Sequence, residues 1–147
     1  MQRLYITNMQ YSEFLFQLFY NLKALYQKNL RVPNLSFQQI LAIAMVDDDG
    51  LEMSSLSKTL GIDNSTATRL IDGLQKKGMV KRVRDKFDNR ILRVVLTDGG
   101  KSIHYLIQSQ LKRIGCDIET QINSKAKEAI IESGISLNWA LLKYLNK

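Results

Sequence analysis

The sequence predicts a mainly helical chain that carries one small β-hairpin. The prediction depends on the segment from Met53 to Gly100, where two short helical patterns are separated by a tight turn at Gly61. Two β-capable runs then follow the second helical pattern. A helix, a turn, a second helix and a hairpin in this order indicate a winged helix-turn-helix, a unit that can place its second helix in a DNA major groove.

The second helix of this unit is expected from Asn64 to Lys77. Asp63 is a suitable N-cap, because its carboxylate can accept hydrogen bonds from the free backbone N–H groups of the first turn. Gly78 suits the position just after the helix end. Four apolar residues recur at helical spacing and should face a core; they are Ala67, Leu70, Ile71 and Leu74.

The opposite face of this helix is small and polar near its N-terminus. Hydroxyl side chains can reach base edges or phosphates, and an arginine can bond a guanine at two atoms. Taken alone, this pattern is as typical of an ordinary amphipathic surface helix as it is of a helix that contacts DNA. The residues that we expect this helix to place on DNA are Ser65, Thr66, Thr68, Arg69 and Lys76.

The predicted hairpin is strongly basic. Its strands are expected at Val80 to Asp85 and at Ile91 to Leu96. Residues 76–93 contain eight Lys or Arg and two Asp, and eight minus two leaves +6 of the formal net charge of +7. One-sided charge in one segment is typical of a phosphate-binding surface. The hairpin residues expected to bind DNA are Lys81, Arg82, Arg84, Lys86, Asp88 and Arg90.

Arg90 lies just past the expected tip of the hairpin. An arginine there is well placed to enter an adjacent minor groove, where a narrow groove has the most negative potential. Asp88, two residues earlier, is expected to orient this arginine. The alternative is a solvated edge hairpin whose charges only prevent aggregation.

Several short patterns in order resemble the MarR family of transcriptional regulators. Leu35 to Gln39 is similar to the start of the family's second helix, and Leu56 to Leu70 to its helix-turn-helix. Gly78 to Arg82 is similar to the exit from the recognition helix. Asp88-Asn89-Arg90, followed by Leu96 to Gly100, is similar to the signature of the family's β-hairpin, or wing. The departures from the family pattern are Asn89, where a second basic residue is frequent, Phe87 in the turn, and Gly99 beside Gly100 at the start of the next helix.

The resemblance implies a two-fold homodimer with two recognition helices about one DNA turn apart on a palindromic site. It implies a DNA-binding domain at residues 35–97, between dimerisation helices at residues 1–34 and 98–147. The helix expected from Tyr11 to Lys28 carries more apolar surface than one stripe requires, which also favours a partner. A monomer whose outer helices complete its own core is the alternative.

The resemblance further implies a repressor that a small aromatic or phenolic effector releases from DNA. The effector would bind between the dimer helices and the DNA-binding domain. Aromatic residues at helical spacing are more often part of a core than of a pocket. The residues expected to line this ligand site are Tyr11, Phe14, Tyr20, Tyr26, Phe37 and His104.

The C-terminal part is expected to be helical. One helix should run from Asp98 to roughly Asn123, with Thr97 as its cap. Ser124 is expected to cap a last helical segment, and Ser133-Gly134 is expected to bend or interrupt it.

Composition argues against several other classes. No apolar run approaches the roughly 18 residues that a transmembrane helix needs. The first ten residues lack the pattern of a signal peptide, and the single cysteine allows no internal disulfide, so a cytoplasmic location is expected. No phosphate-binding glycine loop or nucleophile motif supports an enzyme.

No cofactor or metal is expected. One histidine and one cysteine, His104 and Cys116, are too few for a zinc site, and Asp47 to Gly50 lacks the spacing of a calcium loop. This acidic run is expected to form a turn that leads into a short strand at Leu51 to Met53. Cys116 is interpreted as incidental rather than as a redox switch. The remaining alternative for the whole chain is an architectural nucleic-acid binder that tolerates any sequence.

Overall fold

The computed structural model describes residues 10–147, which form two compact units that meet in sequence between Gln110 and Leu111. Of the first ten residues, for which no signal peptide is expected, only Gln10 is among the described residues. Among the described helices, none is both long and apolar enough to cross a membrane. Helix α5, Asp98–Thr120, contributes residues to both units.

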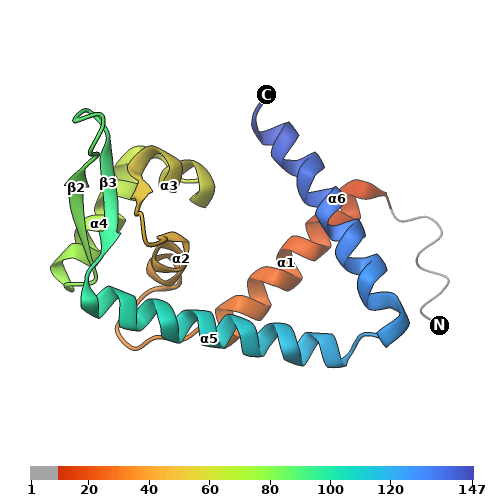
Figure 1. The fold of residues 1–147 in the computed structure, drawn as a ribbon. Helices are drawn as coiled ribbons and strands as arrows, with labels where there is room; N and C mark the ends of the chain where they lie inside the picture. The colour runs from red at the N-terminus through yellow and green to blue at the C-terminus, as the bar shows by residue number, and fades with distance from the viewer. Residues whose placement is uncertain (1–9) are drawn as a thin grey trace. The chain divides into compact units, whose positions relative to one another are not determined.

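The first unit contains the expected helix-turn-helix and hairpin (Figure 1). Its three strands form an antiparallel sheet in the order β1-β3-β2. Val80 pairs with Leu96 and Arg84 with Leu92, so the hairpin tip lies at the opposite end of β3 from the start of α5. The elements of this unit that precede α5 are α1 Tyr11–Asn29, α2 Phe37–Met45, β1 Leu51–Glu52, α3 Met53–Leu60, α4 Asn64–Lys76, β2 Val80–Arg84 and β3 Leu92–Leu96. The mainly helical fold class with a small β-wing is confirmed.

Local sequence signals define α4 much as predicted. The Asp63 carboxylate accepts a hydrogen bond from the Thr66 backbone N–H at 2.9 Å, which confirms the N-cap. Gly61 and Gly78 have φ values of 64° and 70°, a backbone conformation that side chains with a Cβ rarely adopt. The helix ends at Lys76, one residue before the predicted end.

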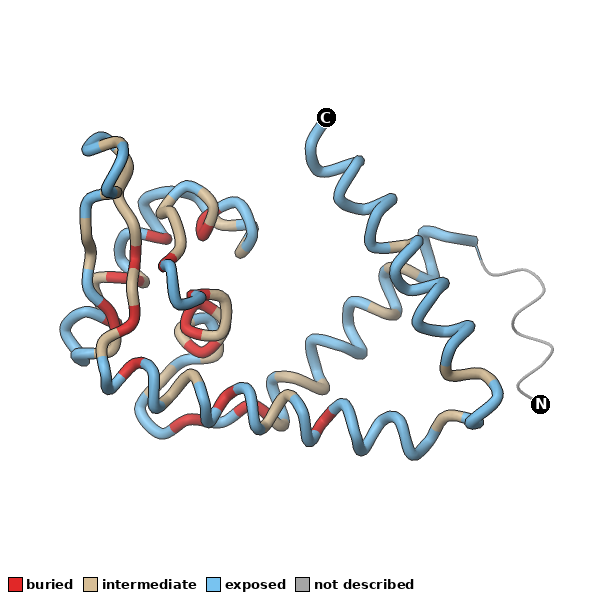
Figure 2. Tube along the Cα trace, viewed as in Figure 1, coloured by how far each residue is buried: buried red, intermediate tan, exposed pale blue. Residues whose placement is uncertain are grey.

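The core of the first unit lies among α2, α3, α4 and the sheet, and it extends to the first part of α5 (Figure 2). On α4, Ala67, Ile71 and Leu74 are fully buried as predicted, whereas Leu70 is only half-buried. The residues that fill this core are Leu30, Val32, Ile40, Ala42, Ile43, Val46, Leu56, Ala67, Ile71, Leu74, Val80, Val94, Leu96 and Ile107. Because the apolar face of α4 is buried in this core, its opposite, polar face is the one that a partner can contact.

Two long helices follow the hairpin, as predicted, but the segment between them differs from the prediction. Thr97 Oγ1 accepts a hydrogen bond from the Gly100 N–H at 3.0 Å, so the expected cap of α5 is confirmed. The prediction of a Ser124 cap is wrong, because the Asn123 side chain accepts from the Lys125 N–H at 3.0 Å and starts a short 3₁₀ turn, Ser124–Ala126. Helix α6 then runs from Lys127 to Leu145.

Of the two outcomes predicted at Ser133-Gly134, the interruption is wrong, because α6 continues through both residues, and the bend stays a prediction. An internal glycine keeps its backbone N–H, so the helical hydrogen bonds can continue through it. Its cost relative to alanine is only about 1 kcal/mol, which a helix of 19 residues tolerates.

Candidate nucleic-acid interface

The face of α4 opposite the core carries the polar residues that the sequence predicted as DNA contacts. Their side chains are exposed, and none contributes to the core of the first unit. They alternate with the buried Ala67, Ile71 and Leu74 along the same helix. These exposed residues are Ser65, Thr66, Thr68, Arg69 and Lys76. The first two turns thus offer short hydroxyl side chains and one guanidinium to a surface that approaches the helix.

The hydroxyl groups on this face have defined partners. Ser65 Oγ donates to Asp63 Oδ1 at 2.5 Å, and Thr66 Oγ1 donates to Asp63 Oδ2 at 2.7 Å. Thr68 Oγ1 donates to the Asn64 carbonyl oxygen at 2.8 Å. Because each hydroxyl hydrogen is already used, the oxygens can accept hydrogen bonds from base amino groups. Sequence reasoning identified Asp63 as a cap but missed these two side-chain contacts, although Ser65 and Thr66 lie within one turn of it.

These contacts lower the pKa of the Asp63 carboxyl well below its ordinary value. The Ser65 hydroxyl is the largest cause, followed by the Thr66 hydroxyl and the Thr66 backbone N–H. All three donate to the charged form and so favour it.

We expect the substitution Asp63→Asn to change how stability depends on pH. The folded pKa is depressed, so the stabilisation by the carboxylate is fully present above the unfolded pKa of about 3.9 and is lost as the pH falls towards the lower folded pKa. Asparagine caps a helix comparably but carries no charge. Urea unfolding from neutral pH downwards should therefore show the wild type losing stability relative to the variant below about pH 4. A constant difference across this range would contradict the assignment.

The side chain of Arg82 reaches from strand β2 to helix α4. Its Nη1 donates to Asp72 Oδ1 at 2.7 Å and to Gln75 Oε1 at 3.1 Å, and its Nη2 donates to the Thr68 carbonyl oxygen at 3.1 Å. The side chain is only 21% exposed. These contacts connect β2 to α4, so Arg82 holds the hairpin against the helix. Its contact with DNA stays a prediction.

The other basic residues of the hairpin are more accessible. Lys81, Arg84 and Lys86 are exposed. Arg84 Nη1 donates to the Asn89 carbonyl oxygen at 2.8 Å, which joins the two sides of the tip. The accessible positive charge of the hairpin is therefore concentrated on β2 and the turn after it.

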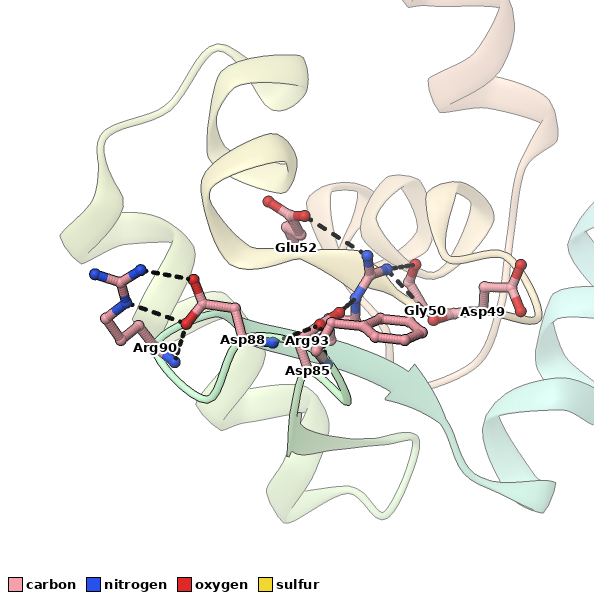
Figure 3. A network of polar contacts seen from close by, with 8 residues as sticks. Asp49, Gly50, Glu52, Asp85, Asp88, Arg90 and Arg93 are labelled. Carbon is pink, nitrogen blue, oxygen red and sulfur yellow. Dashed lines mark hydrogen bonds and ion pairs between the residues drawn. The ribbon is translucent and has the colours of Figure 1, made fainter.

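Arg90 has the partner that the sequence predicted. Asp88 Oδ1 accepts from the Arg90 backbone N–H at 2.9 Å and from Nε at 3.1 Å, and Oδ2 accepts from Nη2 at 3.1 Å (Figure 3). The Arg90 side chain is nonetheless 91% exposed. The pKa of Asp88 is lowered, mainly by the Arg90 side chain. The ion pair uses the Nε and Nη2 groups and does not use Nη1.

Arg93 is the residue that sequence reasoning missed. The sequence indicates only its positive charge, yet its Nε donates to Asp85 Oδ2 at 2.6 Å and its Nη1 donates to the Gly50 carbonyl oxygen at 3.1 Å (Figure 3). Its Nη2 lies 3.6 Å from Glu52 Oε1. Arg93 thereby joins the hairpin to the turn before β1, and alternation along the strand gave no signal for this role.

The six predicted ligand-site residues are not gathered in one described cavity. Phe37 lines an open cavity of about 420 Å³ together with residues of the linker between α1 and α2, including Leu30 and Pro33. The aromatic residues Tyr11, Phe14 and Tyr20 are exposed on α1, whereas Tyr26 and His104 are half-buried. His104 Nε2 lies 2.9 Å from Gln108 Nε2 on the next turn of α5. The ligand site therefore stays a prediction.

The remaining predictions concern Cys116 and metals. Cys116 is a free and exposed thiol on α5. Across residues 10–147, no group of three or more His, Cys, Asp or Glu side chains is placed to hold a metal ion. The run from Asp47 to Gly50 is a turn before β1, as predicted, although Met53 begins α3 instead of ending the strand.

Comparisons with known proteins match this architecture. A model of the MarR family matches residues 37–92. The HTH-type transcriptional regulator SarZ of Staphylococcus haemolyticus is 30% identical over 108 residues, which cover 74% of this chain and 71% of that protein. SarZ of Staphylococcus aureus is 32% identical over 90 residues, which cover 61% of this chain and 58% of that protein.

Two solved structures are similar over most of the chain. Streptococcus pneumoniae FabT, in complex with DNA, is 25% identical with a TM-score of 0.72, and the match covers 91% of this chain and 96% of FabT. A MarR transcriptional regulator from Methanosarcina mazei is 26% identical with a TM-score of 0.75, covering 90% and 99% of the two chains. This chain therefore belongs to the MarR family, whose members are DNA-binding transcriptional regulators and not enzymes.

Proposed function

We propose that this chain is a homodimeric, cytoplasmic repressor that recognises a palindromic site in double-stranded DNA. The observation that carries the proposal is the exposed polar face of α4 beside a cationic hairpin in the same compact unit. In this proposal Arg69 and the hydroxyl groups of the first two turns read base edges in the major groove. Arg90 and its basic neighbours bind the flanking minor groove and the phosphates.

The unpartnered apolar surfaces of α1 and α6 support a dimer. None of the described residues of either helix is buried, although both helices are rich in large apolar side chains. Such surfaces are unfavourable in water and are typical of an interface. The large exposed apolar residues are Tyr11, Phe14, Phe16, Phe19, Tyr20 and Leu22 on α1, and Ile130, Ile131, Ile135, Trp139, Leu141, Leu142, Tyr144 and Leu145 on α6. Two-fold pairing would bury them and set two α4 helices about one DNA turn apart.

Selection of bound duplexes from a random pool, followed by competition, tests this function. We expect the purified protein to enrich one palindromic sequence and to prefer it over random DNA by at least about 10³-fold at physiological salt. Light scattering should give the mass of two chains, both free and bound. Equal affinity for all duplexes would favour an architectural binder instead, and a single chain on DNA would overturn the dimer.

Release by a small aromatic or phenolic effector is the second part of the proposal. Such a ligand acts only if it binds the DNA-free state more tightly than the DNA-bound state. Diverse phenolics should then raise the melting temperature of the free protein and weaken its binding to the selected duplex. If they change neither quantity, this part of the proposal fails while DNA recognition stands.

A further inference from the structure

We propose that Phe87 at the hairpin tip is an apolar wedge that enters the DNA minor groove and partly unstacks a base step. The inference extends the proposed function and depends on it. Phe87 is 99% exposed and is the most exposed large apolar residue in the described part of the chain. Phe87 lies in the turn that joins β2 and β3, at the end of the hairpin opposite the start of α5.

The backbone that carries this ring is held in place by the chain itself. Asp85 Oδ1 accepts hydrogen bonds from the Phe87 N–H at 2.8 Å and from the Asp88 N–H at 3.1 Å. The second carboxylate oxygen of Asp85 accepts from Arg93, which is anchored to the turn before β1 (Figure 3). The Asp85 side chain is only 12% exposed, so the anchor lies inside the unit while the ring lies outside it. A pre-ordered tip lowers the entropic cost of inserting a side chain into a partner.

The ring stays in water although an apolar surface is available nearby. Val83 and Val95 border an open cavity of about 700 Å³ that Phe87 also lines. At 99% exposure, the ring does not fold back onto these valines. A phenylalanine that its own protein leaves exposed is available to a partner, and its burial there would be favourable.

The charges around the ring indicate which partner fits. Three exposed cations lie close to Phe87 in sequence, namely Arg84, Lys86 and Arg90. Carboxylates are present as well: Asp85 pairs with Arg93 and Asp88 with Arg90, and Asp48 and Asp49 line the same cavity as Phe87. Residues 76–93 as a whole still carry a formal charge of +6. An exposed apolar ring on such a basic hairpin suits a polyanion whose groove has apolar walls, and a DNA minor groove has both properties. Phenylalanine is among the side chains that unstack base steps when they are inserted from this groove.

The test compares Phe87→Ala and Phe87→Leu with the wild-type protein on the duplex selected by the wild type. We expect Phe87→Ala to bind about 10-fold more weakly, and Phe87→Leu to keep most of the affinity because it keeps an apolar wedge. No charge changes, so the slope of log affinity against log salt should stay that of the wild type. The matched control Arg90→Ala should instead reduce this slope by about one.

Unstacking is measured with 2-aminopurine placed at base steps where the hairpin tip contacts the selected duplex. We expect its fluorescence to rise when the wild type binds and to rise much less with Phe87→Ala at saturation. Equal affinities, or equal fluorescence with both proteins, would overturn the wedge. Thermal melting confirms that the variants fold. Absence of specific binding by the wild type would instead remove the proposed function itself, so the two failures are distinct.

Discussion

The substitution Gly100→Ala is expected to destabilise the protein by about 3 kcal/mol or more. Gly100 is buried in the first turn of α5, and a Cβ atom there would overlap the carbonyl oxygen of Met79 and lie 2.9 Å from its carbon. The same carbonyl accepts hydrogen bonds from the Thr97 backbone N–H and from Thr97 Oγ1, both at 3.1 Å. Because a backbone carbonyl cannot rotate away like a side chain, α5 would have to separate from the turn after α4. Urea unfolding followed by circular dichroism measures the loss.

The adjacent glycine provides the matched control. A Cβ atom at Gly99 would lie 3.5 Å from the Gly78 carbonyl oxygen and 3.7 Å from Thr97 Oγ1, which are ordinary contact distances. Gly99→Ala should therefore leave stability unchanged or raise it by up to about 1 kcal/mol, because alanine favours the helix and restricts the unfolded chain. Similar effects of the two substitutions would refute the close approach at Gly100.

The substitution Arg69→Ala is expected to abolish discrimination at one base pair of the selected site. Arg69 is exposed in the second turn of α4, where a guanidinium can bond a guanine at two atoms. Such a contact contributes about 1–3 kcal/mol of discrimination. Affinity for the selected duplex should fall by about 10- to 100-fold, whereas binding to random duplexes should fall much less. Competition against duplexes that differ at single positions measures the loss.

Lys76→Ala is the control for Arg69→Ala, because it removes a positive charge from the last turn of the same helix. If Lys76 contacts phosphate, this variant should weaken binding to all sequences alike and reduce the salt slope by about one. A uniform loss with Arg69→Ala as well would place Arg69 on the backbone and leave base recognition to other residues.

The elements defined by local interactions were predictable from the sequence. Helix α4 was predicted to within one residue at its C-terminal end. The signals were the cap at Asp63, the glycine at position 78 that can adopt a left-handed backbone conformation, and the apolar spacing between them. The ion pair of Asp88 with Arg90 was also predictable, because the two residues are two positions apart in one turn. The errors at Ser124 and Gly134 concern the 3₁₀ turn before α6 and α6 itself. Neither element has a buried residue, so capping and glycine signals are weak there and no packing selects between alternatives.

The sequence by itself determined the family, the winged helix-turn-helix and the exposed face of α4, since each depends on residues close together in the chain. Only the tertiary structure decided how the positive charges of the hairpin are used. Arg82 reaches Asp72 and Arg93 reaches Gly50 and Glu52, while Arg90 remains almost fully exposed. A count of charges treats these arginines alike, but packing β2 against α4 and β3 against β1 brings carboxylates and carbonyl oxygens to two of them. Those two stabilise the shape of the hairpin, and the others carry its accessible charge.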